Sequence, residues 1–268
     1  METKKQELRE ICKIFFSLNV NSDENVVQKL INILHEEWIH QLFLVILSKQ
    51  RTNGRFCRTQ KLINELAIML NLIIDLSQKW SRYDSVKSCI ILSQTFYYED
   101  NNKNKIYLYN FLKKNKWLRM PDFWRKIIDV MIVKEIEATK NKNQGEIKKQ
   151  GVDNIVFSHL LSYSSSMKDF NIDQRIILKI LDEFINKYEV AKEFSCTVYN
   201  ILGDEKYVEK LRNEYLSMPD LEEKILEEIN KEEKEKEKEE ADKKMEEKEK
   251  AKNENNNESN INDGENAE

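Results

Sequence analysis

The stretch "RMPDFWRKIIDVMIVKEIE" (residues 119–137) carries the clearest helical pattern in the chain. Its apolar residues recur three and four positions apart, which is the spacing of residues on one face of an α-helix. Pro121 stands just before them, where the first turn of a helix tolerates a residue without a backbone N–H. The segment therefore predicts a helix that packs into a hydrophobic core through Phe123, Trp124, Ile127, Ile128, Met131, Ile132 and Ile136.

The same spacing continues on both sides of this stretch and is interrupted by polar segments. On the N-terminal side, the predicted helices cover residues 3–18, 26–47, 62–76, 80–98 and 106–114. On the C-terminal side, they cover residues 152–167, 173–187, 189–202 and 204–216. Asn171 and Gln174 have the spacing of an N-cap and its capping-box partner. Two polar segments predict loops, a short one at 99–105 and an exposed, mobile one at 138–151.

Glycine and proline are scarce, with five and two residues in a chain of 268. A sheet protein needs these residues at its hairpin turns, whereas a helical protein needs only short breaks between helices. Gly54, Gly145, Gly203 and Pro219 all fall between the apolar-periodic segments. The sequence therefore predicts an all-α protein, either a multi-helix bundle or a short α-solenoid, with no sheet of any size.

The composition changes near Pro219. Residues 221–268 hold ten Lys and 19 Asp or Glu, a net charge of −9, while the rest of the chain carries +5. Apolar periodicity ends at Ile229, which disfavours a coiled coil beyond it, and the Lys and Glu spacings of three and four favour a solvated helix. We expect a helical domain at 1–218 and a charged tail at 219–268. The tail is predicted to be helical or disordered, with disorder over about the last 16 residues.

No stretch of the sequence has the pattern of a catalytic or cofactor-binding motif. "HEEWIH" (residues 35–40) resembles a zinc-binding HExxH helix, but its histidines are five apart. They lie about 140° apart around a helix, so a regular helix cannot direct both at one metal ion. Neither a glycine-rich phosphate loop nor a nucleophile elbow occurs. The sequence therefore predicts no cofactor, no metal and no enzymatic activity.

The sequence also bears on the compartment. The four cysteines, Cys12, Cys57, Cys89 and Cys196, show no paired spacing, which favours buried free thiols in a reducing compartment. The N-terminus lacks the pattern of a signal peptide, and the longest apolar run, at 42–47, is too short to span a bilayer. We therefore expect a cytoplasmic protein without a transmembrane segment, for which peripheral membrane contact stays open.

Aromatic and basic residues are interleaved between positions 96 and 126. Most of the rings are predicted to be core, including Phe96, Trp117 and Trp124. Gln94 and Tyr98 are four apart, so on one helix they share a face and can point away from the core while Phe96 is buried. The basic residues are consistent with contacts to phosphates or acidic headgroups, and equally with a solvated helix rim. The residues predicted to bind a partner are Gln94, Tyr98, Tyr109, Lys113 and Arg125.

Residues 83–130, "YDSVKSCIILSQTFYYEDNNKNKIYLYNFLKKNKWLRMPDFWRKIIDV", resemble the helical segment between the DENN and pleckstrin-homology regions of the SET-binding factors, the myotubularin-related pseudophosphatases. The stretch "NIVFSHLLSYSSSMKDFNID" (residues 154–173) is similar to the part of that domain that follows a variable acidic loop. The resemblance covers about residues 60–190 and departs from the family pattern at Met120, Pro121 and Asp122. It implies a helical module of membrane-traffic regulators, without the activities of their other domains. The matching positions are Ser93, Gln94, Thr95, Phe96, Tyr97, Tyr107, Leu108, Trp117, Phe123 and Trp124.

Two functional hypotheses follow. The first is a non-catalytic helical module that binds a protein partner, with a role in membrane-traffic regulation implied by the resemblance. The alternative is a MIF4G/HEAT-type helical repeat associated with RNA-binding factors. The weak positive charge of the first 220 residues and the interleaved aromatic residues keep this alternative open, although no RNA-binding motif is present.

Overall fold

The computed structural model describes residues 2–17, 24–53, 59–143 and 145–262. It confirms the all-α fold and divides the chain into two compact units, Met1–Pro219 and Asp220–Glu268. The first unit begins with α1 (Glu2–Ser17), α2 (Glu24–Ile33), α3 (Glu37–Asn53), α4 (Gln60–Lys79) and α5 (Tyr83–Ser93). It continues with β1 (Tyr97–Glu99), β2 (Lys105–Tyr107), α6 (Tyr109–Leu112), α7 (Lys116–Arg119), α8 (Pro121–Asn143), α9 (Lys149–Asp169), α10 (Gln174–Tyr188), α11 (Lys192–Tyr199) and α12 (Glu205–Leu216). The second unit is the helix α13 (Leu221–Asn262).

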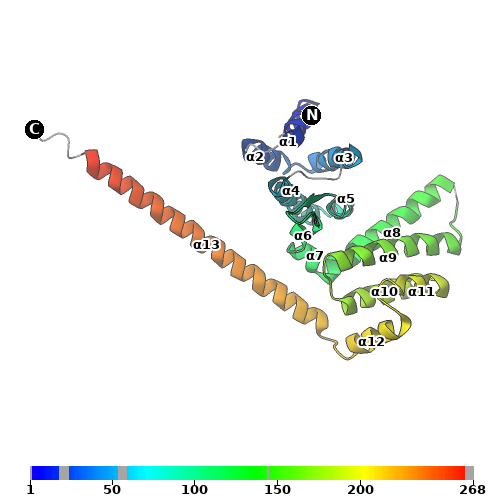
Figure 1. Cartoon of the computed structure of the whole chain (residues 1–268). Coiled ribbons are helices and arrows are strands. Elements are labelled where there is room, and N and C mark those ends of the chain that lie inside the picture. The colour runs from blue at the N-terminus through cyan, green and yellow to red at the C-terminus, as the bar shows by residue number, and fades with distance from the viewer. Residues whose placement is uncertain (1, 18–23, 54–58, 144, 263–268) are drawn as a thin grey trace, which may run out of the picture. The chain divides into compact units, whose positions relative to one another are not determined.

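Helix α4 is the central element of the N-terminal half of the first unit. The Thr59 hydroxyl caps it by accepting a hydrogen bond from the Leu62 N–H at 3.2 Å. Nine of its residues are buried, Ile73 and Ile74 among them, because apolar residues surround most of the helix. It packs against α2 and α5, and α5 in turn contacts α3 and α8 (Figure 1). The pair α4–α5 thereby joins the first helices to those that follow.

Helices α8 to α12 form successive layers (Figure 1). Helix α8 packs on α9, α9 packs on α10 and α11, and α10 packs on α12. Helix α10 lies in the middle of this stack and buries Ile176, Ile177, Leu178, Ile180, Leu181 and Phe184. This side of the first unit therefore has a continuous apolar interior, as the spacing of three and four predicts.

A β-hairpin replaces part of two predicted helices. The predicted helix at 80–98 ends at Ser93, and the predicted helix at 106–114 shrinks to α6. Between them, β1 and β2 pair in antiparallel fashion, with Tyr97 opposite Tyr107. Each strand has three residues, so the prediction of no sizeable sheet is confirmed for the described residues, although the local assignment was wrong.

Three other predicted boundaries were also wrong. The predicted helix at 26–47 is two helices, α2 and α3, because the chain turns at residues 34–36. The predicted loop at 138–151 is short, since α8 continues to Asn143 and α9 begins at Lys149; Lys, Glu and Ala in this segment favour helix. Asn171 does not cap α10. It adopts a left-handed φ of 60°, and Asp173 is the cap, accepting from the Arg175 N–H at 2.8 Å.

The charged tail is helical for most of its length. Helix α13 reaches Asn262, so the described part of the segment predicted to be disordered is helix, and residues 263–268 lie outside the described residues. Ion pairs three and four apart support it, such as Lys224 with Asp220 at 2.7 Å. No described helix is long and apolar enough to cross a membrane. Of the cysteines, Cys12 and Cys89 are buried as predicted, Cys196 is exposed, and Cys57 is outside the described residues.

Candidate functional site

The hairpin β1–β2 begins at a buried anchor and closes through a tight turn. The Phe96 ring is buried, and its carbonyl accepts a hydrogen bond from the Leu108 N–H at 2.9 Å. In the turn, the Asp100 carboxylate accepts from the N–H groups of Asn102 and Asn104, both at 2.8 Å. These hydrogen bonds favour the charged carboxylate and lower the pKa of Asp100. Lys103 has a left-handed φ of 62°, which the asparagine-rich turn accommodates.

Tyrosine and lysine side chains line one face of this hairpin. Tyr97 and Tyr107 are cross-strand partners whose ring centroids are 5.6 Å apart. Tyr107 also stacks on Tyr109, the first residue of α6, at 5.9 Å and an interplanar angle of 15°. The Lys105 ammonium lies 4.9 Å from the centre of the Tyr97 ring, and that of Lys113 lies 5.1 Å from the centre of the Tyr109 ring. We call these five residues the tyrosine–lysine surface.

The core of the first unit holds this surface in place. The Tyr109 ring contacts Phe170 at 6.1 Å, and Phe170 contacts the fully buried Trp124 at 5.9 Å. Gln94, at the end of α5, donates a hydrogen bond to Asp169 of α9 at 2.7 Å. Burial, and secondarily the charge of Asp169, raise the pKa of Tyr109. The half-buried Tyr109, on which Tyr107 stacks, is thus supported by the aromatic core of the first unit.

Four lysines of the hairpin and the segment after α6 form no ion pairs with described residues. Residues 101–121 contain six basic and no acidic residues. Four of these, Lys103, Lys105, Lys113 and Lys114, have no carboxylate within ion-pair distance in the described chain. Glu99 stands opposite Lys105 in the hairpin register without forming such a pair. These four lysines therefore present positive charge that no ion pair of the described chain neutralises.

The five residues predicted to bind a partner do not all lie together. Tyr109 and Lys113 are in contact. Gln94 lies near them, because it donates a hydrogen bond to Asp169, whose charge also acts on Tyr109. Tyr98 lies on the opposite face of the hairpin from Tyr97 and packs on Phe111 at 6.3 Å, because strand residues alternate between faces. The premise that Gln94 and Tyr98 share a helix face is wrong, since α5 ends before both.

Arg125 belongs to a different region. Its guanidinium donates two hydrogen bonds to Glu183 of α10, at 2.7 and 2.9 Å, and another to Asp122 at 3.1 Å. With Phe184 and Lys187 it borders a pocket of about 280 Å³ between α8 and α10. Its side chain is 20% exposed. The guanidinium joins α8 to α10 through these hydrogen bonds. This structural role explains the position of Arg125 without invoking contact with another protein.

Three residues of the tyrosine–lysine surface, Tyr97, Lys105 and Tyr107, escaped the sequence prediction, and Tyr97 had been assigned to the predicted helix at 80–98. Tyr107 and Lys105 were assigned to a helix start and to a loop. The alternation of Lys105, Ile106 and Tyr107, after the turn-forming run "EDNNKN" at 99–104, is the signal that indicates a hairpin.

Two of the three histidines are buried within the helical fold, and one is exposed. His40 is buried and contacts the Leu34 carbonyl through its Nε2, and burial lowers its pKa. His159 is buried between helices, with its Nε2 at 2.8 Å from the Glu135 carboxylate; burial, and then the charge of Lys87, lower its pKa. His35 is exposed. Among the described residues, no group of three His, Cys, Asp or Glu side chains is placed to hold a metal ion.

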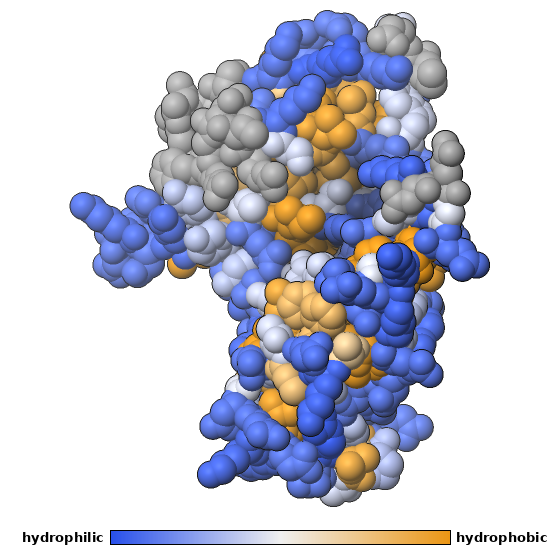
Figure 2. Space-filling view, turned by 90° about the vertical axis from the view of Figure 1, so that its right-hand side faces the viewer, coloured by the Kyte–Doolittle hydropathy of each residue, from blue (hydrophilic) through white to orange (hydrophobic). Residues whose placement is uncertain are grey.

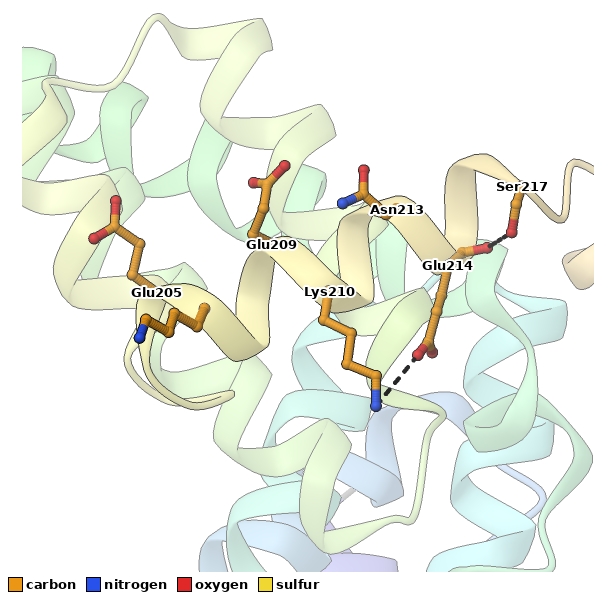
Figure 3. Close-up of a pocket in the computed structure, with 7 residues that line it drawn as sticks. Glu205, Glu209, Lys210, Asn213, Glu214 and Ser217 are labelled. Carbon is orange, nitrogen blue, oxygen red and sulfur yellow. Dashed lines mark hydrogen bonds and ion pairs between the residues drawn. The ribbon is translucent and has the colours of Figure 1, made fainter.

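A pocket of about 750 Å³ lies along α12 and is open to solvent. Figure 3 shows its lining residues projecting from this one helix, with Lys210 reaching Glu214 at 3.7 Å and the Ser217 hydroxyl donating to the Glu214 carbonyl at 2.7 Å. The carboxylates of Glu205 and Glu209 point away from Lys210 (Figure 3). Because the side chains diverge, this pocket lacks the converging polar groups of a ligand site.

Large exposed apolar residues are spread over several elements rather than gathered in one. On the face shown in Figure 2, hydrophobic residues form separate islands bordered by hydrophilic ones. Scattered exposed apolar residues are ordinary for a folded protein. The most exposed of them in the first unit are Leu216, Ile68, Val45, Ile14, Met218, Val133 and Ile91.

Comparison with known proteins adds no relative. No family model, curated protein or solved structure matches this chain. The geometry of the tyrosine–lysine surface is therefore the principal guide to function.

Proposed function

We propose that this chain is a non-catalytic helical module that binds a protein partner through the tyrosine–lysine surface. The observation that carries the proposal is a cluster of three partly exposed tyrosines, two of which lie against lysines that lack a carboxylate partner in the described chain. Tyrosine provides a large contact area with a polar group and little loss of side-chain entropy, so it is enriched where proteins bind each other. Cations without an internal partner add attraction for an oppositely charged surface.

The wider context of the proposal is membrane-traffic regulation in the cytoplasm. The resemblance of residues 83–130 and 154–173 to the SET-binding factor domain supports a role in membrane-traffic regulation. The buried free thiols of Cys12 and Cys89 are compatible with the reducing environment of the cytoplasm. The RNA-associated alternative is less favoured, because the Tyr97 and Tyr109 rings already carry a lysine on a face that a base would use for stacking.

The proposal is tested by proximity labelling and pulldown with the full chain expressed in cells. The variant Tyr107→Ala removes a ring of the surface, and Tyr207→Ala removes a tyrosine of α12 with an exposed fraction of 39% as a matched control. We expect Tyr107→Ala to lose specific partners that the unmodified chain and Tyr207→Ala both retain. Equal partner recovery with all three chains, each shown to be folded by circular dichroism, would remove this surface from consideration.

A further inference from the structure

We propose that the outer edge of β2 accepts an extended acidic peptide segment as a third strand of the hairpin. This inference rests on the proposed function and names the partner chemistry of the same surface. It draws on three features, which are the direction of the backbone groups of β2, the charge around them and the occupied faces of the tyrosine rings.

The backbone of β2 presents hydrogen-bonding groups away from β1. Within the hairpin, Leu108 N–H donates to the Phe96 carbonyl at 2.9 Å, and Asp100 N–H donates to the Asn104 carbonyl at 3.0 Å. In an antiparallel pair the bonded positions alternate, so the N–H and C=O groups of Lys105 and Tyr107 point outward. The Tyr107 carbonyl accepts from the Asn110 side chain at 3.1 Å, whereas neither of the two N–H groups has a partner in the described chain.

An open strand edge is a template for another strand, and it recognises a polypeptide backbone rather than a particular side chain. The two N–H groups, with the Lys105 carbonyl between them, match the alternating groups of an extended peptide. The edge is only three residues long, so backbone pairing alone gives low affinity, and side-chain contacts must supply specificity.

The surrounding charge selects an acidic segment. Lys103 and Lys105 lie on the hairpin, and Lys113 and Lys114 follow α6; none of the four has an ion pair in the described chain. Some basic side chains elsewhere in the first unit are paired, as in Lys149 with Asp153 and Arg212 with Asp182, but these four lie together around one strand edge without such a pair. A peptide with alternating acidic residues would bring carboxylates beside these lysines while its backbone follows β2.

A nucleic acid fits this surface less well. Single-stranded nucleic acids bind through bases that stack on free aromatic faces. Here Lys105 covers a face of Tyr97, and both Lys113 and the Tyr107 ring lie against Tyr109. A peptide strand does not require these faces, because it uses the strand edge and the ammonium groups.

The test uses the full chain labelled with ¹⁵N and a nine-residue peptide of alternating Glu and Thr as the probe. We expect the amide signals of Lys105 and Tyr107 to shift and to gain protection from hydrogen exchange as the peptide is added. Replacing Lys105 and Lys113 together by Gln should weaken binding about fivefold, because each exposed ion pair contributes modestly. The single variant Lys192→Gln removes a charge on α11 and should leave binding unchanged.

Two N-methylated versions of the peptide separate strand pairing from simple charge attraction. Strand addition uses every second peptide N–H, so methylating one alternate set should abolish binding and methylating the other should be tolerated. Equal binding of both versions would overturn strand addition. A peptide of alternating Lys and Thr that binds as well as the acidic one would overturn the charge assignment, and an oligouridylate that shifts the same amides while the acidic peptide does not would replace the peptide by a nucleic acid.

The outcome is distinguishable from failure of the proposed function. If the acidic peptide leaves the Lys105 and Tyr107 amides unchanged while Tyr107→Ala still loses partners in cells, the surface is an interface and the acidic-strand inference is wrong. If the peptide binds as described while Tyr107→Ala retains every cellular partner, the strand edge stands and the cellular assignment of the surface fails.

Discussion

The hairpin region, β1 to α7, and the helical stack, α8 to α12, use the same residue types in opposite ways. In the stack, Asp182 of α10 accepts hydrogen bonds from the hydroxyls of Tyr199 at 2.5 Å and Tyr215 at 2.8 Å, and from the Arg212 guanidinium at 3.0 and 3.1 Å. In the hairpin region, tyrosines contact one another, and Lys105 and Lys113 lie over their rings without an ion pair to a carboxylate of the described chain. The polar groups of this cluster are satisfied within the stack, whereas Lys105 and Lys113 of the hairpin region form no ion pair in the described chain, and the proposed function assigns their charges to a partner.

The largest effect expected from this difference concerns two tryptophans, both predicted from the sequence to be core. Trp124 of α8 is fully buried and donates from Nε1 to the Leu118 carbonyl at 2.8 Å. Trp117 of α7 is half-buried, contacts Phe123 at 6.1 Å and carries Lys116 over its ring at 5.3 Å, so its assignment to the core was wrong in part. Trp124→Ala should lower the free energy of unfolding by about 3–5 kcal/mol, and Trp117→Ala by about 1–2 kcal/mol.

Urea denaturation measures the loss for each variant. Unfolding is followed by the circular dichroism of the helices, a signal that does not depend on the tryptophan that is removed. Equal losses for the two variants would mean that the hairpin region is as tightly packed as the stack, and the comparison would fail.

A second prediction concerns the closed cluster itself. Asp182→Ala leaves two tyrosine hydroxyls and one guanidinium without their acceptor, so we expect a loss of about 2–3 kcal/mol in the free energy of unfolding. Asp129→Ala is the matched control. Asp129 pairs with Lys187 on the same stack, but its side chain is 41% exposed against 15% for Asp182, and an exposed ion pair contributes less than about 1 kcal/mol. Thermal unfolding of the two variants at pH 7 checks the order, and a larger loss for Asp129→Ala would contradict it.

The same cluster predicts how stability depends on alkaline pH. Burial, followed by the hydrogen bond to Asp182, raises the pKa of Tyr215 to about 12, and the same causes raise the pKa of Tyr199. The folded chain then retains phenolic protons that the unfolded chain loses above about pH 10, so stability is complete below that pH and falls between pH 10 and 12. Melting temperatures measured across this range should fall less steeply in Tyr215→Phe than in the unmodified chain. An equal slope would show that Tyr215 ionises alike in both states.

The stack was predictable from the sequence and the hairpin region was not. Apolar residues three and four apart located α9, α10 and the start of α8 to within a few residues, because burial of one helix face leaves a local, periodic record. The polar end of α8, which continues to Asn143, left no such record. The contact of Arg125 with Glu183 joins residues 58 positions apart, and no periodic pattern records a partner at that distance.

The hairpin was missed because its residues also suit a helix. "SQTFYY" follows the apolar helix α5 without a glycine or proline, so periodicity extended the helix past Ser93. The turn instead depends on Asp100, whose carboxylate replaces backbone partners for Asn102 and Asn104, and on Lys103 in a left-handed conformation. Such a turn is set by a few side-chain hydrogen bonds. As a result, Tyr97, Lys105 and Tyr107 were not grouped with Tyr109 and Lys113.

The smallest expected effect is the most informative about function. If the tyrosine–lysine surface binds a partner, its outermost residues should contribute little to folding. Lys105→Gln should change the free energy of unfolding by less than about 0.5 kcal/mol. Tyr107→Ala should change it by less than about 1 kcal/mol. Lys105 loses one cation–π contact at an exposed position, and Tyr107 loses two ring contacts on a half-exposed strand. Phe96→Ala is the contrasting variant in the same hairpin, because its ring is buried and its loss should cost about 3–5 kcal/mol.

Urea denaturation of these three variants decides between two roles for the hairpin. Small losses for Lys105→Gln and Tyr107→Ala beside a large loss for Phe96→Ala mean that the hairpin is anchored on one side and free on the other. If Lys105→Gln or Tyr107→Ala instead cost as much as Phe96→Ala, the surface residues would be part of the architecture, as Asp182 is in the stack. The absence of a carboxylate beside Lys105 would then not indicate a binding site. A residue that the fold itself requires is explained by its structural role, without contact to another protein.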